Sequence, residues 1–211
     1  MDIRFHVAAV ALSAFGSVSV ACVARSAAND QRASAGMHSF RRMPDGKEWT
    51  TENLNIDADG SYCYEDADLH CARYGRLYTW DAAQRGCQSL GEGWRLPTDA
   101  EWRHLARQHG GLREESADKG RAAYTALRTG GRSGFNALLG GGRVSEEEGY
   151  ARLEAHGFYW TASESDAASA WFYNFGKGGL SLNRHRNGNK RMAISVRCVR
   201  DASIERPDRP Q

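Results

Sequence analysis

The side chains best suited to chemistry gather late in the sequence, where aromatic residues alternate with an amide and a basic run follows. Residues 171–175 read Trp-Phe-Tyr-Asn-Phe, and residues 183–191 hold asparagines, arginines, a histidine and a lysine without an acid among them. Aromatic rings offer flat apolar area, while amides and guanidinium groups give directional hydrogen bonds, a combination that suits sugars or anionic polymers. The predicted ligand-binding residues are Trp171, Tyr173, Asn174, Asn183, Arg184, His185, Arg186, Asn187, Asn189, Lys190 and Arg191.

A structural interpretation of the same segment competes with this one. Trp171, Tyr173 and Phe175 alternate as the core-facing residues of a strand do, and the basic run is also typical of a solvated hairpin. Substitution of Arg184, Arg186 and Lys190 separates the two interpretations, because a ligand surface would lose binding whereas a scaffold would lose stability.

Sequence signatures of catalysis and metal binding are absent. The chain has no HExxH, P-loop or serine-hydrolase elbow, and the three glycines of residues 140–142 lack a following Lys-Ser/Thr and indicate a backbone bend. His104 and His109 are too far out of helical register to share one face, as two zinc ligands would. Residues 146–148, three glutamates, are typical of a solvated loop. We therefore expect no catalytic residue, metal site or cofactor.

Four cysteines, Cys63, Cys71, Cys87 and Cys198, follow an earlier one near the amino terminus. An even number in an exported chain favours two disulfides, for which three pairings are possible. We favour Cys63–Cys71 with Cys87–Cys198, because the first pair closes one short loop. On the chain-entropy model the short loop contributes ~2.6 kcal/mol and the long one ~4.8 kcal/mol. The alternative is four reduced, buried thiols in a cytosolic protein.

The first residues predict a signal peptide over 1–22. Arg4 and His6 precede an uncharged apolar run over residues 7–21, which is shorter than the ~20 residues that span a bilayer. A polar stretch follows the run, so export is the expected outcome.

Small residues before Cys22 resemble a lipobox, in which the cysteine is lipidated after cleavage. Ser19 stands where such a motif usually has Leu, so cleavage nearby without lipid is the alternative. Val23 rather than Asp follows Cys22, and sorting to the outer membrane or cell surface is expected for the lipidated form.

Length and net charge limit the number of domains and the class of partner. A chain of 211 residues favours one domain, and a net charge of +2 gives no support to nucleic-acid binding. Residues 23–42 are rich in Ala, Ser, Arg and Gln and predict a flexible linker, while residues 202–211 predict a disordered tail. The domain is expected over residues 43–201.

The first half of this domain predicts two helices. A turn at Pro44 leads into a strand over residues 47–50. Thr79 caps a first helix that ends near Gly91, and Thr98 opens a second through about Gln108 with a capping box. Residues 110–134 predict a variable loop with a weak helical stretch near residues 122–127.

The second half predicts antiparallel strands over residues 158–161, 170–175, 179–182 and 193–199. In the last run Ile194, Val196 and Cys198 would share one face and bury the disulfide. Two helices followed by a β meander indicate an α+β fold.

Five sequence blocks carry a family resemblance, namely residues 43–54, 74–83, 93–102, 158–164 and 195–201. They include Met-Pro-Asp-Gly-Lys-Glu-Trp, Gly-Trp-Arg-Leu-Pro-Thr-Asp-Ala-Glu-Trp and Ser-Val-Arg-Cys-Val-Arg-Asp. In this order they resemble the Fibrobacter succinogenes major paralogous domain (FISUMP) family over residues 43–201. Residues 95–102 are also similar to formylglycine-generating-enzyme-like proteins.

The resemblance implies a C-type-lectin-like fold, with two helices and an antiparallel β meander, but no particular activity, because this fold hosts enzymes, sugar binders and receptors. The related oxidases use a copper-binding cysteine pair near the domain end, where this chain has only Cys198, so an oxidase is a distant alternative. The calcium-dependent sugar motifs of lectins are missing, which favours a calcium-free ligand. The late segment is also similar to the diversified tail of lectin-fold proteins targeted by retroelements.

Together these features predict an exported, lipid-anchored protein of the outer membrane or cell surface that binds a surface glycan or protein without catalysis. The alternative is a structural envelope lipoprotein. The sequence predicts neither the ligand nor the oligomeric state.

Overall fold

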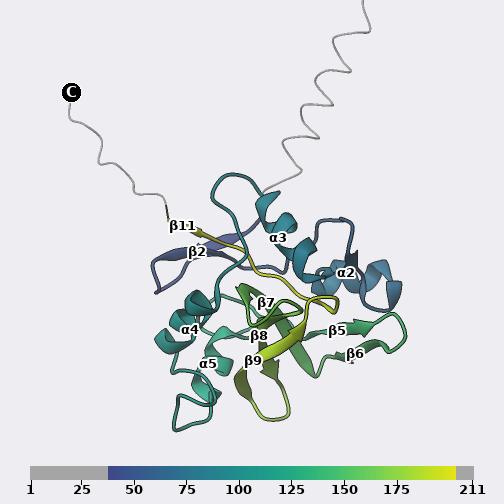
Figure 1. Ribbon diagram of the computed structural model, residues 1–211. Helices are drawn as coiled ribbons and strands as arrows, with labels where there is room; N and C mark the ends of the chain where they lie inside the picture. The colour runs from purple at the N-terminus through teal and green to yellow at the C-terminus, as the bar shows by residue number, and fades with distance from the viewer. Residues whose placement is uncertain (1–37, 203–211) are drawn as a thin grey trace, which may run out of the picture. The chain divides into compact units, whose positions relative to one another are not determined.

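The computed structural model describes residues 38–202 (Figure 1). The predicted signal peptide, Cys22, most of the predicted linker and the tail from residue 203 lie outside the described residues. The elements are β1 (Phe40–Arg42), β2 (Lys47–Thr50), β3 (Ser61–Tyr62), the 3-10 helix η1 (Tyr64–Asp66), α2 (Asp68–Tyr74), β4 (Leu77–Tyr78), α3 (Trp80–Gln88), α4 (Asp99–Gln108), α5 (Arg121–Leu127), β5 (Gly140–Ser145), β6 (Gly149–Leu153), β7 (His156–Glu164), β8 (Ser169–Gly176), β9 (Ser181–Asn189), β10 (Ala193–Ile194) and β11 (Val199–Asp201).

The strands form two sheets. The smaller sheet has the order β1-β2-β11, and the larger has the order β3-β4-β10-β5-β7-β8-β9 with β6 paired to β5. Strands β7, β8 and β9 are an antiparallel meander, as predicted, but β5 pairs with β7 in parallel. The α+β class is therefore confirmed. Among the described residues no helix has the length and apolar character required to cross a bilayer.

Helices α4 and α5 pack on one face of the β7–β9 meander, and α3 packs on part of the other face. On one face Trp102 and Leu105 of α4 and Leu127 of α5 pack with Tyr159 and Tyr173 in one core cluster. A second cluster of buried residues joins α3 to the other face. It includes Ala82, Ala83, Cys87, Trp160 and Val196. This second cluster covers only part of its face, which leaves the rest of the strands open.

Both predicted long helices are present. Thr98 accepts from the Glu101 amide, and the Glu101 carboxylate accepts from the Thr98 amide, which is the predicted capping box of α4. Helix α3 starts after Thr79 as predicted. The structure adds α2, which begins inside the loop closed by the short disulfide and continues past Cys71. The weak helical stretch near residue 122 is the helix α5.

Strand β1 lies inside the segment predicted to be linker. It pairs antiparallel with β2, and Arg41 lies opposite Trp49. Because this pairing extends the smaller sheet, the folded domain includes residues before Met43.

Two strand predictions are corrected. Residues 177–180 form a turn, with exposed Leu180 at φ 46°, so β9 begins only at Ser181. Residues 193–199 are not one strand, because the chain leaves the large sheet after β10 and enters the small sheet at β11. Every residue of this run is buried, so its alternation does not mark one buried and one solvated face.

Both disulfides form as predicted. Cys63 and Cys71 bridge with Cα atoms 4.9 Å apart, and Cys87 and Cys198 bridge with Cα atoms 5.5 Å apart. The second bridge ties α3 to the segment that crosses between the two sheets. It therefore holds together parts of the chain 111 residues apart.

Candidate ligand-binding surface

The open part of the β7–β9 meander carries a set of half-buried side chains that we call the outer face. The register places Phe158 beside Asn174 and Asn183, and places Phe172 beside His185. Because strand residues alternate between faces, these side chains and that of His156 share one side of the sheet. The outer face is thus His156, Phe158, Phe172, Asn174, Asn183 and His185.

Ring contacts connect the outer face into one row. His156 stacks on Phe158 with centroids 5.4 Å apart, and Phe172 stacks on His185 at 4.9 Å. Phe158 and Phe172 meet edge to face at 6.1 Å. The rings therefore hold one another in place while each keeps part of its surface in solvent, which is a pre-organised apolar platform.

An apolar hollow of about 350 Å³ lies against this row. Phe158 and Phe172 form one wall, and Met192 and Ile194 form another. Val144, 45% exposed, stands at the rim. Partly enclosed apolar space of this size is typical of small-ligand sites.

Polar groups border the row. His156 Nδ1 lies 3.0 Å from Asn174 Oδ1, and Asn183 Nδ2 donates to Ser181 Oγ at 3.1 Å. Within residues 38–202, Asn174 Nδ2 and Asn183 Oδ1 make no hydrogen bond to protein. One donor and one acceptor thus remain available beside the aromatic rings.

His185 is neutral at neutral pH, because its pKa is lowered. Burial lowers its pKa, nearby Glu114 opposes this effect, and His156 adds to it. A neutral imidazole keeps both a donor and an acceptor, so His185 adds hydrogen-bonding capacity to the platform without charge.

Three of the predicted ligand residues, Asn189, Lys190 and Arg191, line a different hollow of about 1060 Å³. Its lining also includes Asp81 and Glu146, so acids from distant segments face the basic run. The two hollows share Arg143 and Val144 and are therefore adjacent.

The basic run contains no acid, but folding brings carboxylates to two of its residues. Arg184 donates to both oxygens of Asp99, at 2.6 and 2.7 Å, and its guanidinium lies 3.4 Å from the Trp171 ring centroid. Lys190 Nζ lies 2.6 Å from Glu164 and 4.5 Å from the ring centroid of Trp80. The acids come from segments that are distant in sequence, and only folding brings them to the arginine and lysine.

Tyr173 lies in the core and not on a surface. It is fully buried, stacks on Trp102 with centroids 5.0 Å apart, and donates its hydroxyl to Asp99. Burial and the Asp99 charge raise its pKa, so the phenol stays protonated and keeps this bond. For Tyr173 and Phe175 the structural interpretation is therefore confirmed.

Arg186, Asn187 and Arg191 are exposed, and neither arginine has an ion-pair partner within the described part of the chain. The predicted residues therefore divide among the outer face, the hollow of about 1060 Å³, the core, the Trp171–Arg184 pair and the solvent. Sequence reasoning missed His156, Phe158 and Phe172. Their spacing of two from one another, or from Asn174, was the signal that could have placed them on one face.

Within residues 38–202, no group of three or more His, Cys, Asp or Glu side chains is arranged to hold a metal ion. Cys198, the cysteine nearest the domain end, is bonded to Cys87 and offers no thiolate ligand.

These observations define a disulfide-bonded α+β domain with a half-exposed aromatic platform on its central meander. The chain belongs to the Fibrobacter succinogenes major domain family, whose sequence profile matches residues 37–200. The match runs through β1 to β11 and confirms the resemblance seen in the five sequence blocks. No curated protein and no solved structure matches the chain.

Proposed function

We propose that this protein is an exported, lipid-anchored domain of the outer membrane or cell surface, with a C-type-lectin-like fold, that binds carbohydrate on its outer face and catalyses no reaction. The observation that carries the proposal is the partly buried row of contacting rings beside an apolar hollow. Sugar rings present apolar C–H faces that pack on aromatic rings, while their hydroxyl groups need directional partners.

The free polar atoms of the outer face suit such a ligand. Asn174 Nδ2 can donate and Asn183 Oδ1 can accept, and neutral His185 can do either. Protein partners bind over broad surfaces of about 800 Å² on each side, whereas a partly enclosed hollow of about 350 Å³ suits a small ligand. Carbohydrate is therefore the favoured ligand, and a protein ligand is the second candidate.

The disulfides support export, because such bonds persist in oxidising compartments. Engagement of Cys198 in one of them removes a thiolate that a copper oxidase would require. Attachment through Cys22 is part of the proposal and is tested by mass.

The binding experiment compares two variants on the same strand, β9. Asn183→Ala combined with His185→Ala alters the outer face. Arg186→Ala changes an exposed residue of the same strand that is not part of the outer face. All three proteins are applied to a glycan array, and their thermal unfolding is measured.

We expect the native chain to bind glycans. The double variant should bind at least tenfold more weakly, a loss of about 1.4 kcal/mol or more in binding free energy, and Arg186→Ala should bind as the native chain does. Loss of binding with Arg186→Ala alone would instead assign the ligand to the basic run. Absence of binding to glycans and to surface proteins would favour the structural lipoprotein.

The anchor is tested by non-reducing mass of the protein extracted from membranes. A chain that begins at Cys22, carries acyl mass and lacks the thiol hydrogens of both disulfides is expected. An unprocessed chain would refute export.

A further inference from the structure

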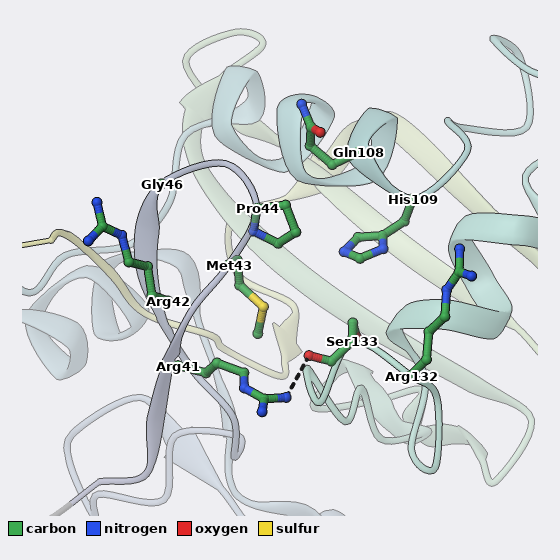
Figure 2. Close-up of a pocket in the computed structure, with 9 residues that line it drawn as sticks. All are labelled: Arg41, Arg42, Met43, Pro44, Gly46, Gln108, His109, Arg132 and Ser133. Carbon is green, nitrogen blue, oxygen red and sulfur yellow. Dashed lines mark hydrogen bonds between the residues drawn. The ribbon is translucent and has the colours of Figure 1, made fainter.

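A third hollow, of about 760 Å³, shares no lining residue with the outer face or with the two hollows beside it (Figure 2). It is formed where the β1–β2 turn approaches the end of α4 and the loop around Ser133. Its charged lining residues are Arg41, Arg42 and Arg132, and no acid lines it. We call it the basic hollow.

The three arginines keep their charge available. Within residues 38–202 none of them has a carboxylate at ion-pairing distance, unlike Arg184 and Arg200 elsewhere in the domain. The nearest acid of the turn, Asp45, already accepts from the Lys47 amide and from Trp49 Nε1. Unpaired guanidinium groups around one hollow create a local positive potential.

Arg41 is held in position at the wall of the basic hollow. Its Nη1 donates to the Ser133 carbonyl at 3.2 Å, and Figure 2 shows its side chain directed toward that residue. A Cβ atom at Gly134 would lie 2.3 Å from Arg41 Nη1, so this glycine makes the close approach possible. The remaining guanidinium donors stay free for a ligand.

His109 supplies an independent sign that a partner is missing. The residue is only 9% exposed, and its Nε2 is buried without a hydrogen-bond partner among the described residues. Figure 2 shows the ring between Pro44 and Arg132. A buried polar atom without a partner is unfavourable unless a ligand or water satisfies it.

The charges around His109 favour an anion as that ligand. Burial lowers the pKa of His109, Arg132 lowers it further, and Asp45 opposes them. The free imidazole is therefore mostly neutral, and a bound anion would stabilise its protonated form.

We propose that the basic hollow binds a tetrahedral oxyanion, a phosphate or sulfate group, through Arg41 and Arg132 with His109 behind them. Guanidinium groups match the oxygen spacing of such anions with paired hydrogen bonds, and two of them beside an imidazole suit a doubly charged group. Arg42 projects from the far side of the turn in Figure 2 and adds positive charge at the rim.

The test is an NMR titration of the full chain with inorganic sulfate and with inorganic phosphate at constant ionic strength. Shifts are expected at the backbone amides of residues 41–43, 45–46, 108–110 and 132–133. Arg41→Ala and Arg132→Ala should each weaken binding by about tenfold. Arg186→Ala removes the same charge from an exposed site on β9 and should leave binding unchanged.

A second readout tests His109. Sulfate keeps its charge near neutral pH, so its affinity should rise as the pH falls and His109 becomes protonated, and His109→Gln should abolish this dependence. Equal loss of affinity in Arg186→Ala, or shifts outside the basic hollow only, would overturn the proposal. The amide spectrum of each variant is compared with that of the native chain to check that the variant is folded.

Two sugar esters identify the source of the oxyanion. Tighter binding of glucose 6-phosphate than of inorganic phosphate would assign phosphorylated sugars, and tighter binding of glucose 6-sulfate than of sulfate would assign sulfated sugars. No gain from either sugar would support a free ion as the ligand of the same hollow.

Discussion

The two faces of β8 and β9 carry similar residue types, but one face is closed scaffold and the other is the candidate binding surface. On the inner face Tyr173 is fully buried against Trp102, and Arg184 pairs with Asp99 at the start of α4. On the outer face Phe172 and His185, their immediate neighbours in sequence, stack together and stay half-buried. One residue along the strand thus separates scaffold from candidate site.

The difference lies in how the polar groups are satisfied. Asp99 receives the Tyr173 hydroxyl and two nitrogens of Arg184, so the inner face is closed by hydrogen bonds. The outer face leaves an amide donor on Asn174 and an acceptor on Asn183 without protein partners in the described chain. Closed networks stabilise a fold, whereas unpaired groups beside apolar area are available to a ligand.

The largest effect is expected from truncating the inner aromatic residue. Tyr173→Ala should lower the free energy of unfolding by about 3–5 kcal/mol, because it opens a cavity against Trp102. Phe172→Ala should cost only about 1–2 kcal/mol, because its side chain is only partly buried. Urea unfolding of both variants measures the contrast. Equal losses would mean that the outer ring is also scaffold and would weaken the case for a binding surface.

A smaller loss of stability is expected at low pH, where Glu101 in the first turn of α4 becomes protonated. Burial alone would raise the pKa of Glu101, but hydrogen bonds from Arg95 and the Thr98 amide, with the Arg95 charge, lower it to about 2. The folded pKa lies below the unfolded value, so the stabilisation is present above about pH 4.5 and is lost as the pH falls toward about 2. It amounts to about 3 kcal/mol at neutral pH.

Denaturant unfolding at neutral pH and through this acid window measures that loss. Glu101→Gln should be less stable than the native chain at neutral pH and should show a flatter dependence below about pH 4.5. An unchanged acid slope in the variant would assign the loss to other carboxylates.

The smallest effect compares two arginines of β9. Arg184→Met leaves the Asp99 carboxylate with fewer donors and should cost about 1.5–3 kcal/mol. Arg186→Met removes an exposed side chain and should change stability by less than about 0.5 kcal/mol. Thermal and urea unfolding of both variants give the difference. A large loss with Arg186→Met would show that the basic run is scaffold throughout.

Local sequence signals predicted the elements that depend on neighbouring residues. The capping box at Thr98 and the strand after Pro44 are set by contacts within a few residues, and both are present. The meander of aromatic strands and the disulfide pairing also followed from the sequence. Strand β1 was missed because its three residues are all exposed and show no alternation of buried and exposed positions, and its pairing with β2 comes from tertiary structure.

The candidate site was predicted only as a segment. Asn174, Asn183 and His185 were identified, but the partners that make them a surface, His156 and Phe158, come from β7. The segment also contained Tyr173 and Arg184, whose partners lie on α4. Alternation alone does not show which face of a strand the helices cover, so the predicted site combined residues of both faces.

The sequence by itself indicated the family, the α+β class and the segment in which ligand contacts are expected, because each depends on residue identity and local spacing. It also favoured the observed disulfide pairing among three possible ones, because only Cys63 and Cys71 lie close in sequence. The tertiary structure decided which face of β8 and β9 is open, which cations are paired, and that three arginines and His109 surround one hollow. Those outcomes depend on which distant segments supply a carboxylate or an apolar cover, and only the folded chain brings such segments together.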